Sequence, residues 1–118
     1  TSKIMALHYN LSKVYALSDN DAEFVNQIVV LFVNEVPKDL LEIKVGIKSE
    51  LHKEVYAYAH KIKPTLDLMG MHVAFEELVL IEAWAKAEGK TKNIKETYKS
   101  VKSQVKEAIK EIKKDFNL

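Results

Sequence analysis

The residues best suited to chemistry in this chain are a histidine and a lysine three positions apart, His60 and Lys63. Residues at this spacing are neighbours on a helix surface, so the two side chains would lie side by side. His60 directly follows Ala59, which belongs to an apolar helical stripe, so the histidine is placed at the edge of a core rather than inside it. An imidazole in this position, with a cation beside it, is suited to receive an anionic group.

The helix that carries His60 is predicted over about residues 51–69, with Gly70 ending it. Its apolar positions recur at spacings of four and three, which is typical of the buried seam of a helical bundle. They are Val55, Ala59, Ile62, Leu66 and Met69. A second line, rotated by one residue, runs along the shoulder of the core. It consists of Tyr56, His60, Lys63 and Asp67.

A turn after Gly70 would fold the next helix, predicted over about residues 72–87, back against this one. Antiparallel helices pair residues that are equally distant from their turn, and this pairing sets Glu82 opposite His60. A carboxylate that faces an imidazole accepts the proton of one ring nitrogen. The other nitrogen is then left with a free lone pair of raised basicity.

Two lysines would supply positive charge at this site. Lys63 lies one turn from His60, and Lys86 lies one turn beyond Glu82. Both could neutralise a phosphoryl group carried by the free imidazole nitrogen. The candidate site therefore combines a nucleophile, a carboxylate that orients it and two cations.

The rest of the chain also favours helix, because glycine and proline number only three and two. Further helices are predicted at about residues 11–17, 21–36, 37–49 and 91–116. The break at Pro37 is expected because proline fits the first turn of a new helix. Short loops between long amphipathic helices favour an all-α fold, an up-and-down antiparallel four-helix bundle with a short extra N-terminal helix. The 118 residues fit one domain.

Three details of this helix assignment can be compared directly with a structure. The inward stripe of the helix at residues 21–36 is expected to consist of Phe24, Ile28, then Leu31 or Phe32, and then Glu35 or Val36. Gly89 is expected to end the helix at residues 72–87. In the last helix the stripe is Ile94, Tyr98, Val101, Val105, Ala108 or Ile109, Ile112 and Phe116.

Several classes of function are disfavoured by what the sequence lacks. It has no cysteine, no Gly-rich phosphate loop and no apolar run long enough to span a membrane. No basic-then-apolar leader pattern begins the chain, so the cytoplasm is the expected compartment. A metal site is not expected either, because no two histidines are spaced i, i+4 and no Glu-x-x-His occurs. His8, His52 and His72 are read as surface or structural residues.

Charge is unevenly distributed along the chain. Residues 90–118 hold nine lysines against four acidic residues, or +5, so a net charge of +1 leaves −4 for the remainder. A basic helix could bind nucleic acid or an anionic membrane surface. The lysines alternate with glutamates and apolar residues, no arginine is present, and no aromatic residues are interleaved for base stacking. A solvated helix face is therefore the preferred interpretation, with no nucleic-acid or membrane partner expected.

These residues resemble the signature of histidine-containing phosphotransfer (HPt) domains. The motif is Ala-His-x-Ile-Lys at residues 59–63, with Gly70 ten residues after the histidine. The upstream stretch, Asp21-Ala22-Glu23-Phe24, then Leu31 to Pro37 and Leu40-Leu41, is similar to the family's lead-in helices. The resemblance covers about residues 11–116, so the whole of residues 1–118 is interpreted as a single HPt domain.

The resemblance implies a monomeric phosphoprotein of multistep phosphorelays in bacterial two-component signal transduction. His60 would accept a phosphoryl group, through Nε2, from a receiver-domain aspartate and pass it to another receiver. Lys63 matches the motif lysine beside the phosphate, Glu82 the residue that bonds Nδ1, and Lys86 a second basic residue of some members. The partners would be receiver domains of response regulators and hybrid histidine kinases, which supply Mg²⁺. The chain would have no cofactor and no kinase activity of its own.

One residue departs from the family pattern. Pro64 stands where glycine usually follows the motif lysine, and a proline there cannot bond to the carbonyl of His60. A local kink or a freed His60 carbonyl is therefore expected. Docking of a receiver should use an apolar patch around the histidine, for which Tyr56 and Pro64, with Ala59 at the margin, are the candidates.

Two alternatives to the phosphorelay intermediate remain open from the sequence. One is a helical scaffold that docks a receiver domain without accepting phosphate. The other is a basic nucleic-acid or membrane-surface binder that uses the Lys-rich last helix.

Overall fold

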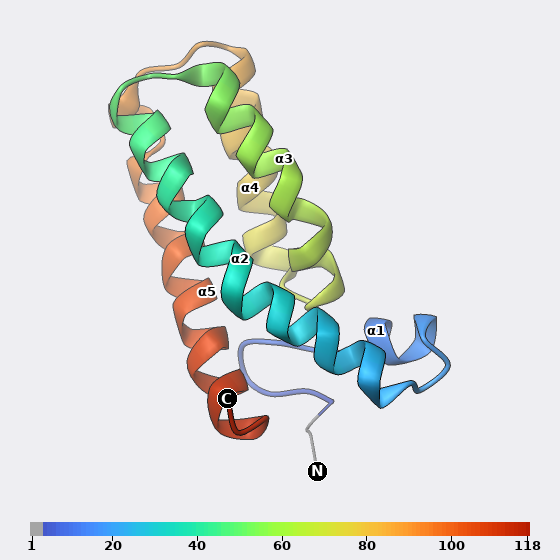
Figure 1. Cartoon of the computed structure of the whole chain (residues 1–118). Coiled ribbons are helices and arrows are strands. Elements are labelled where there is room, and N and C mark those ends of the chain that lie inside the picture. The colour runs from blue at the N-terminus through green and yellow to red at the C-terminus, as the bar shows by residue number, and fades with distance from the viewer. Residues whose placement is uncertain (1–3) are drawn as a thin grey trace.

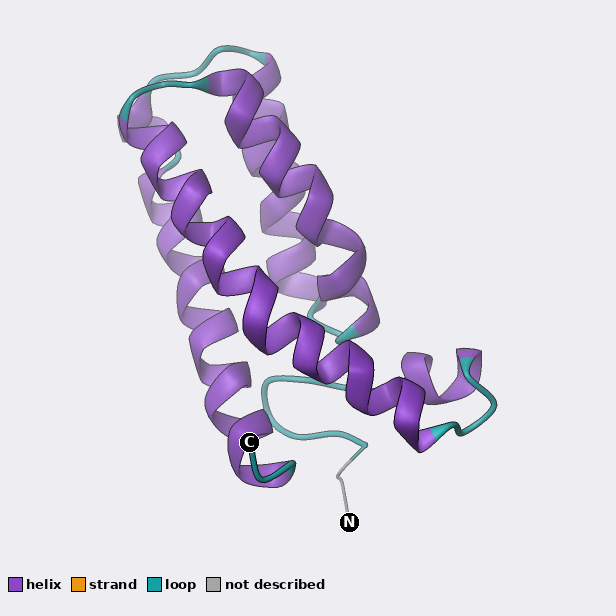
Figure 2. Cartoon of the chain, viewed as in Figure 1, coloured by secondary structure: helices purple, strands orange, loops and turns teal. Residues whose placement is uncertain are grey.

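The computed structural model describes residues 4–118. Within this range the chain is helical and has no β-strand (Figure 2), only a single β-bridge between Met5 and Asn10. The helices are α1 (Ser12–Leu17), α2 (Ala22–Lys48), α3 (His52–Leu68), α4 (His72–Lys86), the 3₁₀ helix η1 (Thr91–Asn93) and α5 (Lys95–Asp115). The predicted all-α class is confirmed.

The four long helices lie side by side and share one core (Figure 1). Helix α2 packs against α3 and α5, and α4 packs against the same two helices. The short α1 packs against α2 near its N-terminal end (Figure 1). The result is an elongated helical bundle of about 45 × 24 × 19 Å.

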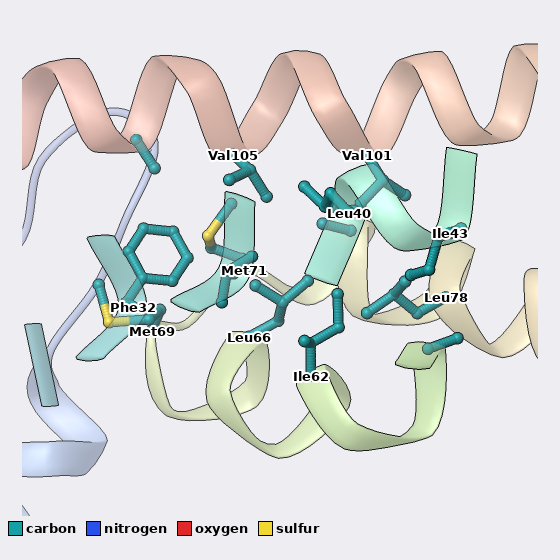
Figure 3. Packing of buried hydrophobic residues seen from close by; sticks show 14 of the residues in the cluster. Phe32, Leu40, Ile43, Ile62, Leu66, Met69, Met71, Leu78, Val101 and Val105 are labelled. Carbon is teal, nitrogen blue, oxygen red and sulfur yellow. The ribbon is translucent and has the colours of Figure 1, made fainter. Parts of the chain in front are cut away.

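The core confirms the predicted seam of α3, and α4 contributes a seam of its own. The α3 seam from Val55 to Met69 is buried, and so is the α4 seam of Ala74, Leu78, Ile81 and Ala85. Figure 3 shows Ile62 and Leu66 among the side chains that fill the interior between the long helices. Because the seams of α3 and α4 face inward, the residues one position away lie at the edge of the core.

The inward stripe predicted for the first half of α2 is wrong at its start, but Phe32 and Val36, each one of two predicted alternatives, are buried. Val25, Val29, Phe32 and Val36 are buried, whereas the side chains of Phe24 and Leu31 are 40% and 47% exposed. Neighbouring positions on this helix are both apolar, so either line makes an acceptable stripe on its own. Packing against α1, α3 and α5 together decides which line turns inward.

The predicted break at Pro37 is also wrong, because α2 continues through it as one helix of 27 residues. Pro37 is exposed, on the side of α2 where water can reach the carbonyl that the missing N–H leaves free. Val36 and Leu40 beside it are buried. Their packing on both sides of the proline favours a continuous helix.

The two turns that bring α4 against α3 and α5 use the same hydrogen-bonded ending. After α3, Gly70 has φ +68°, its N–H donates to Asp67, and the Met71 N–H donates to Leu66. This is a Schellman ending with glycine in the left-handed position, as predicted.

After α4 the left-handed residue is Glu88, with φ +51°, and not the predicted Gly89. Gly89 instead passes close to an indole ring, since a Cβ there would lie 2.3 Å from Cδ1 of Trp84. The predicted start of the last helix at residue 91 also needs correction, because η1 precedes α5. Thr91 donates its hydroxyl to the Ile47 carbonyl at 2.6 Å, which holds this segment against the end of α2.

The two helix endings predict different effects on stability when glycine is removed from one and introduced into the other. Gly70→Ala should lower the free energy of unfolding by about 2 kcal/mol or more, because an alanine there is left-handed and its Cβ would lie 2.6 Å from the Asn10 carbonyl oxygen. Glu88→Gly at the equivalent position after α4 should leave stability within about 1 kcal/mol of wild type, because relief of the left-handed strain offsets the added freedom of the unfolded chain. Urea unfolding of both variants measures this. Equal losses in the two variants would contradict it.

Two tyrosines predict a loss of stability at alkaline pH. Burial raises the pKa of Tyr98, whose hydroxyl donates to the Leu40 carbonyl at 2.8 Å. Burial and the carboxylate of Asp115 raise the pKa of Tyr9. A tyrosine whose pKa is higher in the folded than in the unfolded state contributes its full stabilisation below the unfolded pKa of about 10. This contribution is lost as the pH rises through the folded-state pKa.

Tyr98→Phe should therefore cost about 1 kcal/mol at neutral pH, for the lost hydrogen bond. It should also flatten the decline in stability above about pH 10. Thermal unfolding between neutral and alkaline pH measures both effects. Tyr58→Phe is the control, because Tyr58 is only partly buried. A wild-type slope in Tyr98→Phe would contradict the assignment.

Candidate functional site

The centre of the candidate site is a hydrogen bond between His60 of α3 and Glu82 of α4. The Nδ1 atom of His60 lies 2.8 Å from Oε2 of Glu82. The side chain of His60 is 63% exposed, whereas that of Glu82 is only 9% exposed. The structure thus brings together the two residues that the turn at Gly70 was predicted to pair, with the imidazole outward and the carboxylate inward.

Lys63 contacts the same carboxylate through its other oxygen. Its Nζ atom lies 2.7 Å from Oε1 of Glu82, and its side chain is 20% exposed. Burying a carboxylate is costly unless it is paired and hydrogen-bonded. Glu82 meets this condition with one partner on each oxygen, and both partners come from a single turn of α3. In this structure the charge of Lys63 is therefore held at Glu82.

The imidazole ring of His60 is also held from the side. Tyr56, one turn earlier in α3, stacks on it with ring centroids 5.7 Å apart and planes at 10°. The Nζ atom of Lys86 lies 5.1 Å from the centroid of the Tyr56 ring, on which it makes a cation–π contact. Lys86 thus reaches the histidine through the ring of Tyr56.

An apolar border lies beside the polar residues. The Nζ atom of Lys63 lies 5.7 Å from the centroid of the Phe75 ring, so the lysine is held by an aromatic ring as well as by Glu82. Val79, between Phe75 and Glu82 in α4, has a side chain that is 37% exposed. The contact between Phe75 and Lys63 could not be found from residue spacing, because the two residues lie on different helices.

The three residues expected to dock a partner lie in different environments. Pro64 is exposed and Tyr56 is partly buried. Ala59 is fully buried in the seam of α3, so the expectation that it borders a docking surface is corrected. Helix α3 continues through Pro64. Since proline has no N–H, the carbonyl of His60 receives no hydrogen bond from residue 64.

His8 makes a contact that is similar to the one at His60. Its Nδ1 atom lies 2.8 Å from Oε2 of Glu111 in α5, and its backbone N–H donates to Oε1 of the same carboxylate at 2.8 Å. The His8 side chain is 32% exposed, half as much as that of His60, and Glu111 is 24% exposed. This pair joins the N-terminal segment to α5, which is a structural role.

The other two histidines have no such partner. His52 bonds through Nε2 to the Gly89 carbonyl at 2.8 Å, and its ring centroid lies 4.8 Å from that of Trp84. His72 is exposed at the first position of α4. Of the four histidines, His60 alone combines an exposed ring with a buried carboxylate that is also bonded to a lysine.

A second buried carboxylate was missed by sequence reasoning. Asp39 of α2 is 5% exposed, and its Oδ1 atom accepts a hydrogen bond from Nζ of Lys61 at 3.1 Å. This hydrogen bond raises the pKa of Lys61. Periodicity could not reveal the pair, because Asp39 lies on a different helix and no turn relates it to Lys61. The residue after His60 therefore ties α3 to α2.

The arrangement at His60 is suited to nucleophilic chemistry. An ionised Glu82 accepts the Nδ1 proton, which leaves the Nε2 lone pair on an exposed ring. Among residues 4–118, no group of three or more histidine, aspartate or glutamate residues could hold a metal ion. No helix in the described part of the chain is long and apolar enough to cross a membrane.

Comparison with known proteins adds no relative to this description. No protein-family model matches the chain, and no significant match was found among curated proteins or solved structures. Function is therefore inferred from the geometry of the site and from the residues that resemble the HPt motif.

Proposed function

We propose that this chain is an HPt-type phosphorelay intermediate, an up-and-down antiparallel four-helix bundle that accepts a phosphoryl group on His60 from a receiver-domain aspartate and passes it to another receiver. The observation that carries the proposal is the hydrogen bond of an exposed imidazole to a buried carboxylate. Such a bond fixes the tautomer that a phosphoacceptor needs. The resemblance of residues 59–63 to the HPt motif supplies the class of donor and acceptor.

In the proposed reaction, the Nε2 lone pair attacks the phosphorus atom of an aspartyl phosphate. The new P–N bond forms as the P–O bond to the aspartate breaks, and the aspartate leaves as a carboxylate. The Nδ1 proton stays on the ring, so the phosphorylated imidazole ring carries a positive charge that Glu82 stabilises. Attack by a second aspartate reverses these steps. Mg²⁺ belongs to the receiver domain in this scheme.

Lys63 could bind two anionic groups in this scheme, the carboxylate of Glu82 and the phosphoryl group on His60. Before transfer it is bonded to Glu82 at 2.7 Å. A phosphoryl group on Nε2 would bring two negative charges to the exposed side of the ring, within reach of a flexible lysine on the next turn. Lys86 would add charge from the side of Tyr56. The site would then stabilise the transferring group without any rearrangement of the helices.

One prediction of the proposed function concerns which histidine accepts phosphate. Incubation of the protein with receiver domains phosphorylated by a small-molecule donor should produce acid-labile phosphohistidine on His60. His60→Gln should abolish the label and leave the helical circular dichroism unchanged, because the ring is exposed. His8→Gln is the matched control, since it removes the other histidine that is bonded to a carboxylate. It should label normally.

Each outcome of this experiment has a clear meaning. Label that persists in His60→Gln, or that is lost in His8→Gln, would overturn the assignment of the site. A wild-type protein that binds receivers in a pull-down but never takes up phosphate would instead establish the alternative, a phosphorylation-inactive scaffold that docks a receiver domain.

A second prediction separates the roles of the lysine and the glutamate. Lys63→Ala should slow phosphotransfer by about 10²-fold, the scale expected for the loss of one charge-stabilising donor. Glu82→Gln keeps the size of the side chain but removes the charge that holds the Nδ1 proton, so the transfer rate should fall as well. Lys53→Ala is the control, an exposed lysine of the same helix. Rapid-quench kinetics measures the rates, and a wild-type rate in Lys63→Ala would contradict its role.

A further inference from the structure

The side of the molecule formed by α2 and α5 carries a long basic groove, on different helices from those that hold His60. One hollow lies between the C-terminal end of α2 and the N-terminal end of α5, and a second lies further along the same two helices. Tyr98 and Lys102 line both hollows, so the two are adjacent, and we call them together the basic groove. Figure 1 shows α2 and α5 running side by side over this length.

The rims of this groove are unusually uniform in charge. Eight lysines and no acidic residue line the two hollows. They are Lys44, Lys48, Lys95, Lys99, Lys102, Lys106, Lys110 and Lys113. The net charge of the chain is +1, so the rest of the molecule carries 1 − 8 = −7. Two acidic residues contact residues that line the groove: Glu50 is bonded to Thr91, and Glu96 lies 3.5 Å from Lys99.

The charges of α5 are segregated around its axis. At about 100° per residue, the lysines of α5 that line the groove fall within a sector of about 80°, and the acidic residues of α5 lie outside this sector, with Glu96 nearest to its edge. Two of these acidic residues face the N-terminal segment, where Glu111 bonds His8 and Asp115 accepts from Tyr9. A merely solvated helix face would mix the two signs, as most surfaces do.

The floor of the groove is apolar. Leu40, Ile47 and Val105 are buried beneath it, and Tyr98 is fixed by its hydrogen bond to the Leu40 carbonyl. Leu41 is a lining residue whose side chain is 58% exposed. The lysine stems add further apolar surface. Six of the eight lysines lie on α5, whereas α2 contributes only Lys44 and Lys48, at the end near Thr91. The groove therefore presents an apolar strip with a row of cations along its α5 side.

We propose that this groove binds an acidic amphipathic helix of a partner protein. Such a helix would lay an apolar stripe on the floor and place acidic residues along the lysines of α5, with one end also against Lys44 and Lys48. From Lys95 to Lys113 the groove runs for about 27 Å, the length of a helix of roughly five turns.

The groove suits a helix better than the other polyanions that a basic surface could attract. Its single aromatic residue, Tyr98, is buried, so bases would have no ring on which to stack. An anionic bilayer is the competing partner, and it is measured against the peptide in the same assay. The proposal is independent of phosphotransfer, since the groove lies on α2 and α5 and the His60 site on α3 and α4.

Binding is tested with the full chain and a synthetic helical peptide of about 18 residues, which carries leucines at i, i+3, i+4 and i+7 between glutamates. Fluorescence anisotropy should show saturable one-to-one binding that weakens with added salt. A peptide of the same composition in scrambled order should bind at least tenfold more weakly. Vesicles of phosphatidylserine and phosphatidylcholine and a DNA duplex serve as the competing polyanions.

Matched variants distinguish the groove from general basicity. The double variant Lys106→Glu and Lys113→Glu should weaken peptide binding by about tenfold or more, as expected for two reversed contacts at an exposed rim. Lys114→Glu, next in the chain but turned about 100° around α5 and outside both hollows, should bind as wild type does. Leu41→Gln should also weaken binding, whereas Leu31→Gln, an exposed leucine elsewhere on α2, should not.

The proposal is overturned if the wild-type chain fails to bind the peptide or binds both peptides equally. It is also overturned if Lys114→Glu loses as much affinity as the double variant, or if vesicles or DNA bind more tightly than the peptide. None of these results bears on His60, whose labelling is measured without the peptide. Failure of this proposal and failure of the phosphorelay proposal are therefore distinguishable.

Discussion

The candidate site depends on one buried carboxylate. Glu82 holds an imidazole on one oxygen and an ammonium group on the other, both from a single turn of the facing helix. Removal of either partner would leave a buried acceptor poorly satisfied, which costs more than the contact itself contributes. Orientation of His60, placement of Lys63 and the alignment of α3 with α4 are therefore coupled. The polar residues that would do chemistry also help to hold the two helices in register.

The sequence could predict this pairing because the turn is short. Gly70 fixes where α3 ends and α4 begins, so Glu82 follows from counting residues away from the turn. No comparable turn relates Asp39 to Lys61, and that pair could not be found from spacing. The predicted inward stripe of α2 is wrong at its start because neighbouring positions, such as Phe24 and Val25, are both apolar. Local pattern leaves that choice open, and only packing against the neighbouring helices decides it.

Proline and glycine had less predictable effects than their usual preferences suggest. Pro37 and Pro64 both lie within continuous helices, and both prolines are exposed. Gly89 is required for the space it leaves beside Trp84, while Glu88 takes the left-handed conformation. In each case the tertiary surroundings outweigh the local rule. The same segment, between α4 and α5, carries Thr91 to the end of the basic groove.

The segment that precedes α2 is part of the packed structure of the bundle. Leu11 and Val14 are fully buried, and the Asn10 N–H donates to the Met69 carbonyl at 2.8 Å, beside the turn that aligns α3 with α4. A fragment that started at α2 would keep all four long helices and every residue of the candidate site. It would nevertheless uncover apolar side chains and loosen that turn. Fusions or trimmed versions of the protein should therefore retain the segment that precedes α1.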